Sequence, residues 1–255
     1  MSGPHKSHLE REIELHKKLA AHYEDRYRDE FSQVFQSEWN RALLAISRVA
    51  ADRVLELGCG SGILLGQLKA RSRFAVGFDV SPDMMRSARS LGAPLVTGNG
   101  SVLPFKDASF DLVSCRGVLH HLPDVPAALR EIHRVLRPGG ELILSEPSND
   151  WWLVRFAREL MYRFSDRFDE DDEGFRSKPL RALLQSVGFG DLRMERFGYS
   201  AYVLAGFPDH LPILRWMPGS AVLTSFLVRV DRLWAKAPLL DRMSLQLLVS
   251  ARRSA

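Results

Sequence analysis

The sequence predicts an α/β fold, with a mainly parallel β-sheet covered by helices on both faces. Val54–Leu57 is an apolar run with one acid that leads directly into glycines at 58, 60 and 62, which is the pattern of a buried strand turning sharply into a helix. Short apolar runs then alternate with amphipathic segments over the next hundred residues. Asp79 ends the second apolar run, at the edge where ligands of open α/β sheets bind. We therefore expect one large domain with its ligand site at the carboxyl ends of the strands.

Composition and charge narrow the class of protein. The chain has 255 residues, 45% of them hydrophobic and 26% charged, which suits one soluble domain of ordinary composition. The formal net charge is +4, but lysines and arginines are scattered among 31 acids and form no run that could follow a phosphate backbone. Nucleic acid is therefore not an expected partner.

Neither a leader nor a membrane span is expected. The first twenty residues lack the apolar core of a signal peptide. The uncharged stretches Phe197–Pro208 and Trp216–Val228 are shorter than the roughly 20 residues that cross a bilayer. Cys59 and Cys115 are the only cysteines, and each is expected to be a small buried filler. These features predict a cytoplasmic protein without an integral membrane segment.

The glycine loop is expected to lie beneath a ligand. A Cβ at positions 58, 60 and 62 would collide with a ligand lying on the backbone, or would forbid a positive φ. A dinucleotide site has the spacing G-x-G-x-x-G, whereas the third glycine here comes one place early. Glu56 beside the loop would repel a pyrophosphate and attract an ammonium group. The loop therefore favours a ligand that carries an amino group.

Helical spacing predicts two N-terminal helices, from Leu9 to Tyr27 and from Phe31 to Ile46. A helix over Ile63–Ala70 and a strand over Phe74–Val80 follow the glycine loop. Asp79 at the end of this strand is placed to accept hydrogen bonds from both hydroxyls of a ribose.

The middle of the chain continues the alternation. The expected elements are a helix from Met84 to Gly92, a strand over Pro94–Thr97, a strand over Ser109–Cys115, a helix over Pro126–Leu136 and a strand over Glu141–Ser145. Arg137-Pro138-Gly139-Gly140 is expected to separate the last two. Further on, a helix over Lys178–Val187 precedes strands over Asp191–Phe197 and Leu245–Ala251.

Three motifs carry a resemblance to a known family. They read Val-Leu-Glu-Leu-Gly-Cys-Gly-Ser-Gly from Val54, Gly-Asn-Gly-Ser-Val-Leu-Pro-Phe from Gly98, and Leu-His-His-Leu-Pro-Asp from Leu119. Together the segment Val54–Glu146 resembles the class I SAM-dependent methyltransferases, especially their small-molecule, quinone-methylating subfamily. The resemblance implies a Rossmann-like, seven-stranded, mainly parallel sheet, with N-terminal helices and a helical insertion before the last strand. It also implies an N-terminal cap over residues 1–50 and a methyltransferase domain over residues 51–255.

The implied cofactor is S-adenosyl-L-methionine (SAM), and its product is S-adenosyl-L-homocysteine. By the resemblance, residues from six segments would contact it: Glu56, Gly58, Cys59, Gly60 and Gly62 at the methionine end, Asp79 with Val80 at the ribose, Met84, Asn99, Gly100 and Ser101 around the adenine, and Arg116 and His121 at the reacting edge. Asn99 stands where the family carries an acid, and its amide oxygen can still accept from the adenine amino group.

Candidate catalytic residues are His120, His121 and Glu146. An alcohol or phenol must lose its proton as it attacks, and an imidazole can accept one at neutral pH. Glu146 could orient a histidine, hold a substrate hydroxyl or cap the next helix. No metal site is expected, because the acidic run Asp166–Glu173 is typical of a solvated loop.

Residues 147–180 and 200–243 are predicted to cover the substrate. The resemblance to the family is weak in both segments. For the apolar helix in the second segment three roles stay open: covering the core, lining an apolar pocket, or contacting a membrane or a second subunit as a homodimer. The predicted function is methyl transfer to a small, hydrophobic acceptor, at oxygen. The alternatives are a membrane lipid or quinone acceptor, a SAM-binding regulator without turnover, and a nicotinamide dehydrogenase.

Overall fold

A computed structural model describes residues 27–156, 174–206, 212–237 and 240–254. The predicted first helix up to residue 26 and the acidic run Asp166–Glu173 lie outside these ranges. Within them, no helix is both long and apolar enough to span a bilayer.

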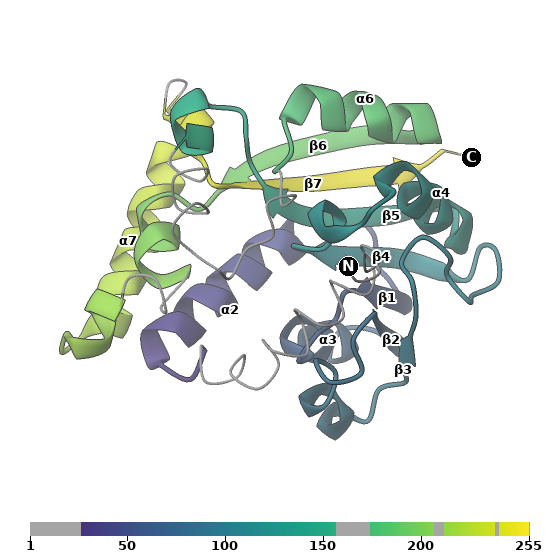
Figure 1. Cartoon of the computed structure of the whole chain (residues 1–255), viewed down its shortest axis with the longest axis horizontal. Coiled ribbons are helices and arrows are strands. Elements are labelled where there is room, and N and C mark those ends of the chain that lie inside the picture. Colours follow the sequence, from purple (N-terminus) through teal and green to yellow (C-terminus); the bar gives the residue numbers. More distant parts are fainter. Residues whose placement is uncertain (1–26, 157–173, 207–211, 238–239, 255) are drawn as a thin grey trace, which may run out of the picture.

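A seven-stranded sheet forms the centre of the molecule (Figure 1). Its order is β3-β2-β1-β4-β5-β7-β6, and the strands from β3 to β5 are parallel, whereas β7 runs antiparallel to both β5 and β6. The strands are β1 (Arg53–Leu57), β2 (Phe74–Asp79), β3 (Leu95–Thr97), β4 (Phe110–Arg116), β5 (Leu136–Pro147), β6 (Phe189–Phe197) and β7 (Gln246–Arg253). The prediction of a seven-stranded, mainly parallel sheet is confirmed.

Helices cover both faces of the sheet. On one face, α4 (Val125–Val135) and α6 (Ser177–Val187) pack against a large apolar cluster that includes Leu55 and Val113. On the other face, α2 (Glu30–Ala45) and α3 (Ile63–Lys69) pack against a cluster containing the alternate strand residues. Successive side chains of a strand point to opposite faces, which explains why central strands buried on both sides are almost continuously apolar.

Two predicted boundaries in this region are wrong. β5 begins at Leu136, which pairs with Phe110 before a register shift, so Arg137–Gly140 lie inside an irregular strand instead of separating a helix from it. The helix predicted from Met84 is a series of turns followed by a 3₁₀-helix over Ser87–Leu91. A 3₁₀-helix places residues three apart on one side, and Ala88 and Leu91 both pack against Gly62.

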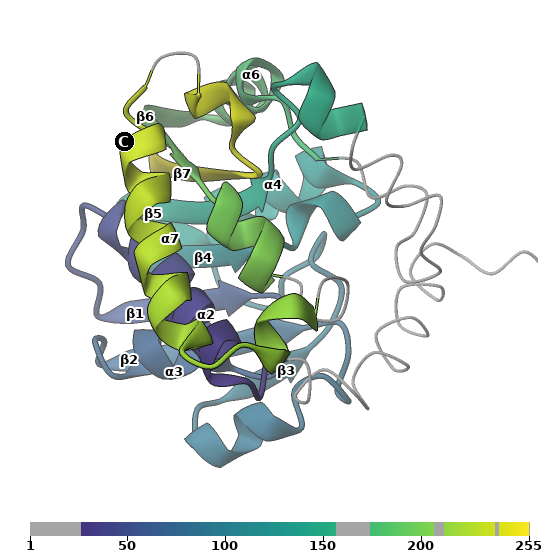
Figure 2. The same ribbon diagram turned by 90° about the vertical axis from the view of Figure 1, so that its left-hand side faces the viewer.

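The insertion between β6 and β7 packs mainly on α2. It contains a π-helix (η3, Tyr202–Gly206), a 3₁₀-helix (η4, Pro212–Trp216) and α7 (Ser220–Trp234), which lies beside α2 in Figure 2. Buried side chains from the insertion and from α2 form one apolar cluster: Phe31, Phe35, Ala201, Tyr202, Ala205, Leu214 and Val228. Among the three roles left open, the inner side of α7 covers the core.

A single carboxylate ties α7 to the chain that leaves β6. Asp231 is buried and accepts hydrogen bonds from the backbone N–H groups of Tyr199 and Ala201 at 3.0 and 3.1 Å. It also accepts from both the backbone N–H and the hydroxyl of Ser200, at 3.0 and 2.7 Å. Asp231 thereby fixes the path of the insertion over α2.

Candidate active site

The predicted site residues lie at one edge of the sheet. They belong to the last residues of β1, β2, β4 and β5 or to the segments that directly follow β1 to β4, and these strands are parallel neighbours. Because the carboxyl ends of parallel strands meet at the same edge, the fold brings together motifs that are distant in sequence.

The glycine loop is hydrogen-bonded to the end of β2. The backbone N–H groups of Gly58 and Cys59 donate to the carbonyl of Phe78 at 2.7 and 3.0 Å. The Asp79 carboxylate accepts from the N–H of Gly60 at 2.8 Å through Oδ2 and from the N–H of Ser81 at 2.9 Å through Oδ1. Asp79, predicted to meet a ribose, therefore also holds the glycine loop in place.

All three loop glycines, including Gly60 with φ +46°, have the positive φ that was expected, and protein neighbours add a second requirement at two of them. Gly58 has φ +72°, and a Cβ there would lie 2.1 Å from the Val118 side chain. Gly62 has φ +85°, and its Cβ would lie 2.8 Å from the Cβ of Ala88. At Gly60, by contrast, the nearest atom a Cβ would meet is Cε of Met84, at 3.8 Å. Protein neighbours thus require glycine at 58 and 62, while the surface above Gly60 is open enough for a ligand.

Glu56 is a buried acid with an unsatisfied oxygen. Its side chain is buried in β1, and Oε2 has no hydrogen-bond partner within the part of the chain that the structure describes. Burial raises the pKa of Glu56 to about 8, although the nearby charge of Arg116 opposes this shift. A buried carboxyl group without a partner is costly. An ammonium group placed at this oxygen would satisfy it, so the residue fits the amino group of SAM.

Three polar residues on α2 were missed by the sequence analysis. Ser32, Gln36 and Asn40 are four residues apart, so they share one face of the helix, and all three are buried. Among the described residues, Ser32 Oγ, Gln36 Nε2 and Asn40 Nδ2 find no hydrogen-bond partner. Their spacing could have revealed them, but Phe31, Phe35 and other aromatic residues nearby indicated only a core helix.

Arg116 connects this polar face of α2 to the sheet. Its Nη1 donates to Gln36 Oε1 at 2.9 Å and to Asn40 Oδ1 at 2.5 Å. The guanidinium carbon lies 5.0 Å from the ring centroid of Trp39. Because Arg116 occupies both amide oxygens, the amide N–H groups of Gln36 and Asn40 remain as donors at the edge of the sheet. Buried donors of this kind fit the carboxylate at the methionine end of SAM.

The segment predicted to meet adenine forms a tight turn after β3. Asn99 Oδ1 accepts from the N–H of Ser101 at 2.9 Å, which leaves one lone pair on this oxygen for a ligand. Gly100 is buried beside Leu122, and the nearby Val80 is partly exposed. The Leu103 N–H donates to the carboxylate of Glu131 on α4 at 2.7 Å, which anchors the turn.

His120 and Glu146 form a hydrogen-bonded pair. Glu146 is completely buried near the end of β5, and its Oε2 lies 2.7 Å from His120 Nδ1. Its Oε1 accepts from the N–H groups of Val118 and Leu119 at 3.0 and 2.9 Å. The rings of His120 and His121 are neighbours, with centroids 4.0 Å apart. The structure therefore couples Glu146 directly to His120.

The two cysteines are buried among apolar residues. Burial raises the pKa of both thiols far above their usual range, with Glu56 adding to the effect at Cys59 and Glu146 at Cys115. Both side chains thus remain protonated, which agrees with their prediction as small fillers.

The fold and this site define a class of enzyme. A glycine loop after β1, an acid at the end of β2 and a histidine–carboxylate pair at the end of β4 and β5 are arranged on a sheet of class I methyltransferase topology. Residues 55–144 match the family model described as a methyltransferase domain.

Curated relatives agree with this class. The chain is 30% identical to a demethylmenaquinone methyltransferase of Lactiplantibacillus plantarum over 213 residues, which cover 72% of this chain and 89% of the relative. It is 35% identical to a demethylmenaquinone methyltransferase of Mycolicibacterium gilvum, over 48% of this chain and 56% of the relative. The chain belongs to the class I SAM-dependent methyltransferase family, and its cofactor is SAM.

Solved structures show the same fold. A SAM-dependent methyltransferase from Thermotoga maritima superposes with a TM-score of 0.69 at 18% identity, over 95% of this chain and 99% of that chain. Phosphoethanolamine N-methyltransferase 2 from Haemonchus contortus, in complex with SAM, matches with a TM-score of 0.55 at 16% identity, over 86% of this chain and 53% of that chain.

Proposed function

We propose that this methyltransferase acts on a small, hydrophobic acceptor with an ionisable hydroxyl group and transfers the methyl group to its oxygen, with His120 as the base. The observation that carries the proposal is the 2.7 Å contact between His120 Nδ1 and the buried Glu146 carboxylate.

The contact with Glu146 gives the two nitrogens of His120 different roles. An ionised carboxylate can only accept, so Nδ1 carries the hydrogen in this bond and Nε2 carries the lone pair. His120 Nε2 then takes the hydroxyl proton of the acceptor, and the nearby carboxylate stabilises the imidazolium. Glu146 cannot rotate freely, because Val118 and Leu119 donate to its other oxygen. The pair thus supplies an oriented base.

SAM, when bound, supplies an electrophilic methyl group on a sulfonium, and transfer leaves S-adenosylhomocysteine. We assign its amino group to Glu56 and its carboxylate to the amide donors of Gln36 and Asn40, because these buried polar atoms are unsatisfied among the residues that the structure describes. Asp79 is assigned to the ribose, and Asn99 to the adenine. These residues align the methyl group and the acceptor, which is the main contribution of a protein to such a transfer.

A quinone-type acceptor is the second candidate. It is favoured by the names of the curated relatives, which are demethylmenaquinone methyltransferases. A reduced quinone is also an aromatic compound with ionisable hydroxyl groups, so the same base could serve it.

Methyl transfer to a panel of acceptors tests the proposal. Purified protein and methyl-labelled SAM are incubated with catechols, alkyl phenols and a reduced demethylmenaquinone, and products are analysed by NMR. We expect an O-methyl signal with at least one hydroxylated aromatic. A methyl group found only on carbon or nitrogen would overturn oxygen transfer, and SAM binding without any transfer would favour a regulator.

The amide donors of α2 are expected to contribute to cofactor affinity. Gln36→Leu should weaken S-adenosylhomocysteine binding by about tenfold in calorimetric titration, because a hydrogen bond to a charged group contributes roughly 1.5–3 kcal/mol. Gln33→Leu is the matched control, since Gln33 lies on the exposed side of the same helix. Equal affinities of the two variants for S-adenosylhomocysteine would show that Gln36 does not contribute to cofactor binding.

Cofactor binding is expected to release a proton from Glu56. With a pKa of about 8, the carboxyl group of Glu56 is protonated in most molecules of the cofactor-free protein at pH 7. An ammonium group beside it would favour the ionised form. Titration with S-adenosylhomocysteine at pH 7, in buffers of different ionisation enthalpy, should reveal close to one released proton per site. Affinity should rise with pH up to about 8. A Glu56→Gln variant that releases as many protons as wild type would contradict the assignment.

A further inference from the structure

The outward side of α7 carries an apolar stripe. Val222, Phe226 and Leu233 are 75, 59 and 66% exposed. They lie within about 40° of one another around the axis of a helix with about 3.6 residues per turn. Thr224 and Val228 are buried on the opposite side. Leu223 and Leu227 of the same helix pack against the apolar cluster on α2.

This stripe belongs to a wider concentration of exposed apolar side chains. Nine of the fifteen large apolar side chains exposed in the described residues come from the segment between 203 and 240, which includes Trp216 at 80% exposure: Val203, Ile213, Trp216, Met217, Val222, Phe226, Leu233, Trp234 and Leu240. A concentration of exposed apolar side chains of this kind favours an interaction surface in this segment.

Positive charge accompanies the apolar stripe. Arg229 lies at the edge of the stripe, Arg232 lies further round on the same flank of α7, and Lys236 lies in the turn that follows the helix. Arg229 and Lys236 have no ion pair among the described residues, whereas Arg232 pairs with Glu38 on α2. The acid in α7, Asp231, is buried against the chain after β6 and does not offset the exposed charge. The exposed side of α7 is therefore both apolar and basic.

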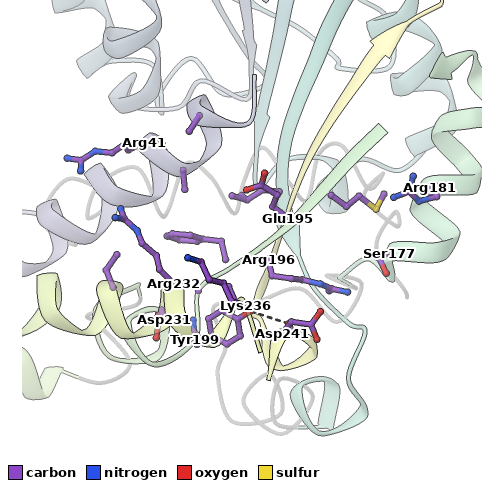
Figure 3. Close-up of a pocket in the computed structure, with 18 of the residues that line it drawn as sticks. Arg41, Ser177, Arg181, Glu195, Arg196, Tyr199, Asp231, Arg232, Lys236 and Asp241 are labelled. Atoms are coloured by element: carbon purple, nitrogen blue, oxygen red, sulfur yellow. Dashed lines mark hydrogen bonds between the residues drawn. The ribbon is translucent and has the colours of Figure 1, made fainter. Parts of the chain in front are cut away.

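The basic character continues into a groove next to α7. The groove has a volume of about 820 Å³ and lies between α2, β6, α6 and α7 (Figure 3). Six basic residues line it against three acids, of which Asp231 is buried: the basic residues are Arg41, Lys178, Arg181, Arg196, Arg232 and Lys236. Figure 3 shows Arg41 on α2 and Arg232 on α7, at the side of the groove where these helices face each other. Arg41 and Arg232 pair with Glu38 and Arg196 pairs with Asp150, so Lys178, Arg181 and Lys236 carry the unpaired positive charge of the groove among the described residues.

We propose that the outward side of α7, together with Trp216, docks onto an anionic lipid bilayer. Val222, Phe226 and Leu233 enter the boundary between headgroups and acyl chains, while Arg229 and Lys236 contact lipid phosphates. An amphipathic helix that combines Phe and Leu on one side with Lys and Arg beside them has the features of an interfacial helix. Tryptophan also favours this boundary, because its ring is apolar and its N–H is polar.

A second copy of the chain fits this surface less well. In a two-fold symmetric dimer the same patch faces itself, so Arg229 and Lys236 would meet the equivalent cations without exposed acids on α7 to offset them. Lipid phosphates supply the missing negative charge. The proposal goes beyond the methyl transfer argued above and does not depend on the identity of the acceptor.

Co-sedimentation with vesicles tests the docking surface. The full chain, without cofactor, is mixed at low salt with vesicles of phosphatidylcholine alone or of equal parts phosphatidylcholine and phosphatidylglycerol. We expect retention on the anionic vesicles only. The double variants Phe226→Ser/Leu233→Ser and Arg229→Glu/Lys236→Glu should each lower the partition constant between vesicles and solution by at least about tenfold. Thermal unfolding verifies that both variants fold.

Matched control variants locate the effect on α7. Phe74→Ser removes an exposed aromatic at the start of β2, and Arg71→Glu/Arg73→Glu reverses two exposed charges beside it. Both controls should bind like wild type. The proposal fails if the wild-type protein does not bind anionic vesicles, or if the controls lose as much binding as the α7 variants. It also fails if analytical ultracentrifugation shows a wild-type dimer and the α7 variants are monomers.

Discussion

Replacing Glu146 by glutamine is expected to lower kcat by about 10²–10⁴-fold, the range attributed to an oriented general base. Glutamine has nearly the same shape, but only one of its two terminal atoms can accept a hydrogen bond. In the wild type, one oxygen accepts from Val118 and Leu119 and the other accepts from His120. If the amide oxygen keeps the two backbone bonds, its NH₂ group faces His120 Nδ1 and selects the tautomer that carries the hydrogen on Nε2. His120 would then have no lone pair for the acceptor.

Kinetics and cofactor binding separate this effect from a loss of structure. Initial rates should show the fall in kcat, while calorimetric titration should give an S-adenosylhomocysteine affinity close to that of wild type. Glu195→Gln on the edge strand β6 is the control. A kcat within threefold of wild type would show that His120 is not the base, or that Glu146 does not orient it.

Replacing Asp231 by alanine is expected to lower the free energy of unfolding by about 3 kcal/mol or more, because each buried donor left without an acceptor costs roughly 1–3 kcal/mol. The backbone N–H groups of Tyr199, Ser200 and Ala201 would lose their common acceptor in a place that water reaches poorly. The segment 199–201, whose Ala201 belongs to the apolar cluster on α2, would lose its hydrogen-bonded anchor to α7.

Denaturant unfolding measures the change directly. Asp231→Asn keeps one acceptor oxygen and should cost less than the alanine variant. Asp83→Ala, which removes a partly exposed carboxylate near Arg86, is the control and should change stability by less than about 1 kcal/mol. A loss below 1 kcal/mol for Asp231→Ala would mean that water replaces the carboxylate, and that the insertion is held by its apolar contacts.

The sheet was predictable because its signals are local. A buried parallel strand is a short apolar run, and Val54–Leu57 followed by three glycines specifies a strand, a loop and a helix within a dozen residues. β5 was placed five residues too late because Pro138 and two glycines usually end an element, whereas here Leu136 pairs with Phe110 across an irregularity. Pairing between distant residues overrode the local pattern.

Parts of the site that depend on side-chain contacts across elements could not be predicted. The sequence presents His120 and His121 as equivalent, and only the turn after β4 directs one of them to Glu146. Likewise, Ser32, Gln36 and Asn40 could be placed on one helical face, but not on the face toward Arg116. Periodicity defines a face, and tertiary packing decides what the face meets.

The contact between Gly58 and Val118 links two motifs that are sixty positions apart. A Cβ at Gly58 would overlap the Val118 side chain, so the space between β1 and β4 admits one side chain from the pair and not two. The cofactor loop and the segment bearing His120 therefore cannot be varied independently. A residue with a side chain at position 58 would therefore require a smaller side chain at position 118.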